Sequence, residues 1–67
     1  MGKHTYIIYP IKGADITIEA DRYCSYCENG CIRIEFHKVR TVDEHTKVNY
    51  VVALFNLNNI VGFERID

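Results

Sequence analysis

The segment Cys27–Cys31 contains Asn29-Gly30, a tight-turn signal in the middle of a long run of alternating residues. Asn-Gly is a strong short-range marker of a β-hairpin, because both residues adopt positive φ angles at little cost. Apolar and polar residues alternate on both sides of it, whereas no window shows a clear apolar period of 3.6 residues. The pattern therefore predicts an all-β protein with a long central hairpin, about 16–26 and 31–42.

The length of the hairpin loop decides which side chains share a face of the sheet. A two-residue Asn29-Gly30 loop would place Cys27 opposite Ile32 and would mix apolar and polar residues. A three-residue loop, Glu28–Gly30, with Gly30 in a G1 bulge, aligns the apolar residues and places Tyr26 opposite Ile32. We therefore predict the three-residue loop. The inner face of the hairpin then carries Ile16, Ile18, Ala20, Cys24, Tyr26, Ile32, Ile34 and Phe36.

Three further strands are predicted outside the hairpin. They are the short run Tyr6–Tyr9 before Pro10, the run Val48–Phe55, and the run Ile60–Ile66. The five strands, joined by short turns, predict a single small domain over residues 1–67. We expect an antiparallel meander that forms a small barrel or sandwich.

The strand at Val48–Phe55 is apolar on both faces, and a strand of that kind should be covered on both. A chain of 67 residues without helices has little material for a second layer. Either the sheet curls around this strand or the second face meets another copy. We predict a homo-oligomer whose interface includes Val51, Ala53 and Phe55.

The composition excludes several classes of function. The chain is 48% hydrophobic with a formal net charge of −1, so it has a dense core or interface and no basic field for general nucleic-acid binding. No apolar run has the length of a signal peptide or a membrane span. Three cysteines without an export signal predict a reducing, cytoplasmic location.

Three cysteines surround the turn. Cys24 and Cys27 have the Cys-x-x-Cys spacing of zinc sites, and Cys31 offers a third sulfur. In the predicted register Cys24 faces inwards and the other two face outwards, so we expect no metal or other cofactor. The alternative is an interaction module stabilised by zinc on these cysteines, or by a disulfide between Cys27 and Cys31.

The predicted register also gathers polar side chains on the outer face of the hairpin. It places Asp21 opposite His37, Tyr23 opposite Glu35, and Arg33 beside them. The guanidinium of Arg33 and the ring of Tyr23 could hold a phosphate and a base. The pair Asp21 and His37 could transfer protons. The alternative is an ordinary solvent-facing side of a sheet, which would show the same alternation of polar residues. Because no catalytic motif is present, we predict that these five residues bind a ligand or partner and that the protein is not an enzyme.

The segment Val51–Phe63, a strand followed by an Asn-rich turn and another strand, resembles the small orphan β-rich accessory proteins of phages and prophages of Gram-positive bacteria. The resemblance implies action in the cytoplasm of the host cell against host defence or physiology. It implies a non-enzymatic protein that works by binding, either blocking a host protein or sequestering a small nucleotide signal.

Overall fold

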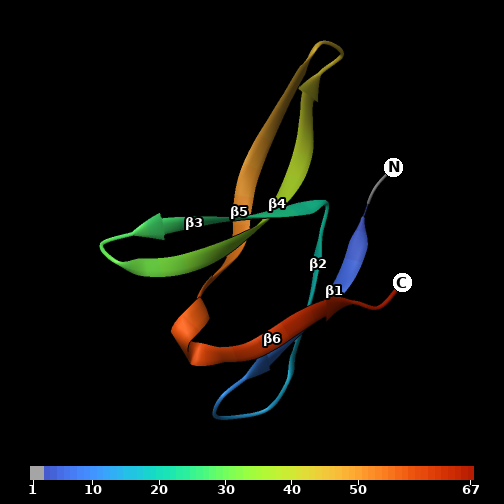
Figure 1. Ribbon diagram of the computed structural model, residues 1–67. Coiled ribbons are helices and arrows are strands. Elements are labelled where there is room, and N and C mark those ends of the chain that lie inside the picture. The colour runs from blue at the N-terminus through green and yellow to red at the C-terminus, as the bar shows by residue number, and fades with distance from the viewer. Residues whose placement is uncertain (1–2) are drawn as a thin grey trace.

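The computed structural model describes residues 3–67, which form six strands and one short 3₁₀ turn (Figure 1). The elements are β1 (His4–Pro10), β2 (Ile16–Ala20), β3 (Arg22–Glu28), β4 (Cys31–Asp43), β5 (Thr46–Asn56), η1 (Leu57–Asn59) and β6 (Ile60–Arg65). They build two three-stranded antiparallel sheets with the orders β2-β1-β6 and β3-β4-β5. The all-β prediction is confirmed. Residues 3–67 form six strands rather than five, and the two sheets do not close into a barrel. No helix in this part of the chain is long and apolar enough to cross a bilayer.

The sixth strand arises because the predicted strand 16–26 turns a corner at Asp21. The backbone N–H of Asp21 donates to the carbonyl of His37 at 2.8 Å, and its carboxylate accepts from the backbone N–H of Val39 at 2.6 Å. These bonds hold the corner against β4, so that β2 pairs in one sheet and β3 in the other. The alternation of inward and outward side chains changes phase at the corner: Ala20 is buried, and the next side chain against the core is Tyr23, three residues later. A prediction that treats residues 16–26 as one strand therefore assigns the wrong face to β3.

The β3–β4 hairpin has a two-residue loop, and our prediction of a three-residue loop is wrong. Glu28 pairs with Cys31, and both loop residues have positive φ, 52° at Asn29 and 79° at Gly30. This is the signature of a type I′ turn, whose twist matches that of the flanking strands. The apolar residues of β3 and β4 do not all share a face, because on β3 it is Tyr23, opposite Phe36, that lies against the core.

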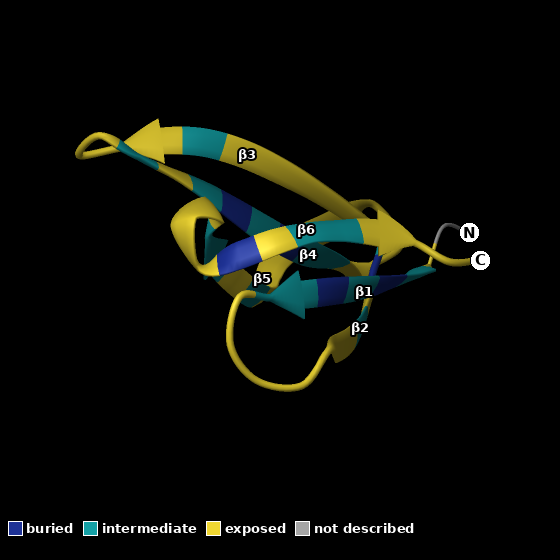
Figure 2. Ribbon diagram, turned by 60° about the horizontal axis from the view of Figure 1, so that its bottom comes forward, coloured by how far each residue is buried: buried dark blue, intermediate teal, exposed yellow. Residues whose placement is uncertain are grey.

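The two sheets share one small core (Figure 2). Its buried residues are Tyr6, Ile8, Ala20, Ile34, Phe36 and Ile60. Phe36 is fully buried and contacts rings from the opposite sheet, with ring centroids 5.0 Å from Tyr6 and 5.4 Å from Phe63. Of the predicted inner face, Ala20, Ile34 and Phe36 are buried, whereas Ile32 and Cys24 are exposed.

The distal half of the β4–β5 hairpin projects away from the core (Figure 1). Every residue from Val39 to Val52 is exposed, and we call this segment the hairpin arm. It begins at a bulge, where Phe36 pairs with Ala53 and His37 with Val51, so that Val52 is an extra residue on β5. The radius of gyration is 13.2 Å, against about 11 Å for a compact chain of this length. The arm accounts for the extended shape.

Candidate functional site

The observed register brings five polar or reactive side chains together on the face of the β3–β4 hairpin opposite to Phe36. Cys24 lies opposite Glu35 and Tyr26 opposite Arg33, with His37 two residues beyond Glu35 on the same face. We call these five residues the polar face. Alternation along two regular strands is what places them there, since side chains two apart on a strand point the same way.

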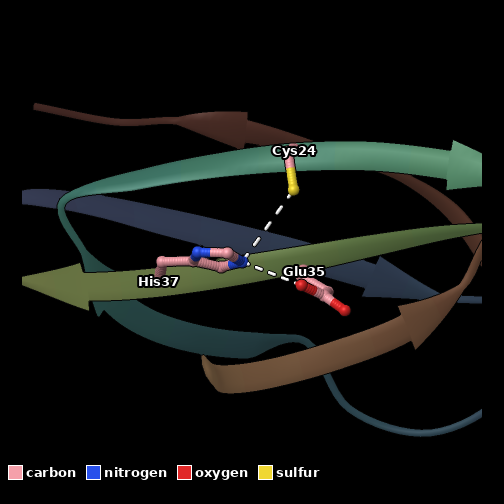
Figure 3. Close-up of side chains that lie close together, drawn as sticks. All are labelled: Cys24, Glu35 and His37. Atoms are coloured by element: carbon pink, nitrogen blue, oxygen red, sulfur yellow. Dashed lines mark hydrogen bonds and ion pairs between the residues drawn. The ribbon is translucent and has the colours of Figure 1, made fainter. Parts of the chain in front are cut away.

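The centre of the polar face is a cluster of three donor atoms of different kinds (Figure 3). His37 Nε2 lies 2.9 Å from Glu35 Oε1 and 3.9 Å from Cys24 Sγ. The side chains of His37 and Glu35 are only 16% and 23% exposed, whereas Cys24 is exposed. The second ring nitrogen of His37, Nδ1, is buried and has no hydrogen-bond partner among residues 3–67. The ring therefore presents Nε2 to the cluster.

Hydrogen bonds hold the carboxylate of Glu35 in its charged form. The Tyr26 hydroxyl donates to Glu35 and is the largest cause of the lowered pKa of that carboxyl, and the bond with His37 is the next. The same hydrogen bond to Glu35 raises the pKa of the Tyr26 phenol. At the edge of the face, Arg33 Nε lies 3.3 Å from Glu28 Oε1. The polar face thus holds opposite charges close together, while Arg33 Nε, like His37 Nδ1, makes no hydrogen bond within residues 3–67.

The structure brings together three of the five residues predicted to bind a ligand. Arg33, Glu35 and His37 lie on the polar face, but Tyr23 lies on the opposite face and Asp21 is engaged in the β2–β3 corner. The predicted pairings of Tyr23 with Glu35 and of Asp21 with His37 assumed a three-residue loop. Because the loop has two residues, neither pairing occurs. Reasoning from the sequence placed Cys24 and Tyr26 on the inner face, and considered Cys24 only as a zinc ligand together with Cys27 and Cys31. A two-residue Asn29-Gly30 loop would have placed both residues on the polar face.

Tyr23 instead lies at the edge of the aromatic layer between the sheets and is about half exposed. Its ring contacts Tyr6 at 5.9 Å and meets Phe63 edge to face at 5.0 Å. These three rings, with Glu64 and Arg65, line a hollow of about 380 Å³. Tyr23 and Arg33 project from opposite faces of one sheet, so they do not form the predicted clamp for a base and a phosphate.

The three cysteines do not form a cluster with one another. All three are free thiols, and Cys27 lies opposite Ile32 on the other face of the hairpin from Cys24. Residues three apart on a strand point to opposite faces, so the Cys-x-x-Cys spacing cannot bring two ligands to one ion here. The candidate donor set in the described part of the chain is therefore Cys24 with Glu35 and His37, not Cys24 with Cys27 and Cys31.

A second exposed surface follows β5. Ala53 and Phe55, two of the three predicted interface residues, pack against the core of their own chain, and Val51 is half exposed. The bulge at Val52 and the pairing of Leu54 with Glu35 expose a set of apolar side chains on β5 that shares only Val51 with the predicted interface. That set is Val48, Tyr50, Val51, Val52 and Leu54.

No protein-family model, curated protein or solved structure matches this chain. Function therefore has to be inferred from the residues and their geometry: the polar face on β3–β4, and the exposed apolar strand β5 with its arm.

Proposed function

We propose that this protein is a non-enzymatic accessory protein of phage type, which acts in the cytoplasm of a bacterial host by binding a host protein. We propose further that it works as a homo-oligomer, joined through β5. The observation that carries the proposal is β5 itself, an edge strand of eleven residues with exposed apolar side chains.

An edge strand with few protective features favours pairing with a second copy of the chain. Proteins that stay monomeric protect such edges with charges, proline or bulges. Of these features β5 has one charged residue, Lys47, and one β-bulge, at Val52, and it has no proline. Eleven residues at about 3.3 Å per residue give an edge of roughly 36 Å. Antiparallel pairing of β5 with β5 of a second copy would join two three-stranded sheets around a twofold axis.

The exposed area also supports association. A molecular mass of 7.8 kDa predicts an accessible surface of about 4,400 Å² for a compact monomer, whereas this chain exposes 4841 Å². A standard interface buries about 800 Å² on each partner. The apolar residues of the hairpin arm are where such an interface would form, because association would remove them from water.

The polar face is the surface that we propose meets the host protein. It is part of an open sheet and offers Tyr26 and Arg33, residue types that often dominate binding energy at protein interfaces. Exposed Leu54, opposite Glu35 on β5, adds apolar area to the same face. A small nucleotide would favour a concave site with free aromatic faces, and in the hollow beside Tyr23 the rings already pack on one another.

Light scattering tests the oligomer. We expect the wild-type protein to have a solution mass of two chains or more, and Val51→Lys to be monomeric, because the new charge would be buried in the β5 pairing. Val61→Lys is the matched control, since Val61 is an exposed valine on the edge strand of the other sheet. A wild-type protein that stays monomeric at millimolar concentration would contradict the proposal, as would loss of assembly in Val61→Lys alone.

Affinity capture from a lysate of a Gram-positive host tests the partner surface. We expect a host protein to be retained by the wild type and by Lys12→Ala, which removes an exposed cation that lies outside both the polar face and the hairpin arm. Arg33→Ala should lose that protein, because truncating a central interface arginine commonly costs about 2 kcal/mol or more. Equal retention by all three proteins would remove the polar face from consideration. Specific retention of a nucleotide instead would favour the sequestering function.

A further inference from the structure

We propose that Cys24, Glu35 and His37 form a binding site for a divalent transition metal, and that zinc is its natural occupant. This inference uses the polar face that we propose meets the host protein, but it rests on the donor atoms themselves and would hold whether or not a partner binds there. It also differs from the cysteine-only site that the Cys-x-x-Cys spacing suggests.

The three side chains are held by two strands that pair directly with one another. Cys24 and Glu35 are opposite residues of the β3–β4 ladder, and His37 follows Glu35 by two residues on the same face. Cross-strand neighbours of this kind have Cβ atoms about 5 Å apart. The backbone therefore positions the three ligands before any ion arrives, which lowers the ordering cost of binding.

The distances between the donor atoms suit an ion placed among them. Zinc bonds to imidazole and carboxylate are about 2.0–2.1 Å and to thiolate about 2.3 Å, so a tetrahedral ion separates its ligand atoms by roughly 3.3–3.6 Å. Here the three donor atoms lie within 4.8 Å of one another. The nitrogen–sulfur distance is 3.9 Å and the nitrogen–oxygen distance 2.9 Å. Small rotations about the terminal side-chain bonds would bring the sulfur, oxygen and nitrogen donor atoms to bonding distance from a single ion.

The chemistry of the donors selects the metal. A thiolate with an imidazole favours zinc and related transition metals, whereas magnesium and calcium need oxygen ligands. Tyr26 lies on the same face as Glu35 and is placed to serve as an outer-shell hydrogen-bond donor to that ligand.

The site has three protein ligands and therefore leaves one tetrahedral position open. Open positions of this kind take water or a group from a partner. The affinity should be moderate, because the Nδ1 atom of His37 lacks an acceptor among the described residues and outer-shell partners of this type contribute about 10- to 100-fold. A partner that supplies the fourth ligand would tighten binding.

Titration of the reduced, chelator-treated protein with Co²⁺ and then Zn²⁺ tests the site. We expect one ion per chain, with the near-ultraviolet charge-transfer absorption of a thiolate–cobalt bond, displaced by zinc. Cys24→Ser should abolish that absorption, and His37→Gln should weaken zinc binding by more than about 100-fold, since it removes a direct ligand.

Cys27→Ser is the matched control, because it removes a thiol from the same strand but from the opposite face. It should bind cobalt and zinc as the wild type does. The proposal is overturned if the wild type takes up no stoichiometric ion, if the absorption survives in Cys24→Ser, or if Cys27→Ser loses binding as fully as Cys24→Ser. Circular dichroism of each variant in the chelator establishes that it is folded before titration.

Discussion

At the scale of single residues, Glu35 organises the polar face. Its carboxylate accepts from the Tyr26 hydroxyl and is bonded to Nε2 of His37 at 2.9 Å, so one acid connects both strands of the hairpin. A charged acceptor makes these hydrogen bonds stronger than neutral ones. The same carboxylate is the oxygen ligand in the proposed zinc site, so Glu35 would both connect the two strands and bind the ion.

The lowered pKa of Glu35 predicts a loss of stability in acid. The pKa of its carboxyl is below the ordinary value of 4.5 in the folded chain, so the contribution of Glu35 to stability is present above about pH 4.5. It is lost as the pH falls through the lower, folded pKa. We expect the free energy of unfolding, measured by urea titration in chelator, to fall in that window, and Glu35→Gln to flatten part of the fall.

Asp43 in the turn of the arm also has a pKa lowered from its ordinary value of 3.8, because it accepts from the backbone N–H of His45, and its contribution is lost at lower pH in every variant. The comparison with Glu35→Gln therefore isolates Glu35. Glu19→Gln, which removes an exposed carboxylate from β2, should keep the wild-type slope. An identical slope in Glu35→Gln and the wild type would show that the hydrogen bonds of Glu35 do not stabilise the fold.

At the scale of elements, the β3–β4 turn sets the composition of the polar face. A loop of two residues rather than three shifts β3 by one position against β4, and a shift of one residue exchanges the faces. Cys24 and Tyr26 thereby join Glu35, while Tyr23 joins Phe36. The positive φ angles of Asn29 and Gly30 are what make this loop possible.

Substitution of Gly30 should therefore destabilise the hairpin. At φ 79°, a side chain at position 30 costs about 1–2 kcal/mol, although nothing lies within 4 Å of the added Cβ atom. Thermal unfolding should show a lower midpoint for Gly30→Ala. Gly62→Ala is the control: its surroundings are equally open and its φ is not positive, so it should be neutral or slightly stabilising. Equal midpoints for the two variants would argue against the type I′ turn.

At the scale of the whole molecule, the fold combines a small two-sheet body with a projecting arm. The buried core is made of six residues, and Phe36 joins the sheets at its centre. A core of this size gives a 67-residue chain limited stability, and association is one of the usual remedies. The extended shape and the exposed β5 strand therefore support the same interpretation. The two-sheet body folds around its own core, and the apolar residues of the hairpin arm form the surface that a second copy would cover.

Several features of the fold could be predicted from the sequence, because they depend on neighbours along the chain. Alternation identified the strands on both sides of Asn29-Gly30, and it identified Ile34 and Phe36 as core residues. The apolar character of β5 on both faces was also visible. The candidate site was predicted in part: Arg33, Glu35 and His37 share a face because they alternate on one strand.

The sequence by itself determined the all-β class, the position of the central turn and the spacing of side chains along each strand, since these follow from local backbone preferences. The two-residue register follows from the local preference of Asn29-Gly30 for a type I′ turn. Only the tertiary structure decided the corner at Asp21 and the bulge at Val52. Both depend on hydrogen bonds between residues distant in the chain, which no local pattern records. The corner breaks the alternation between Ala20 and Tyr23, and for that reason Cys24 meets Glu35 and His37, and Tyr23 does not.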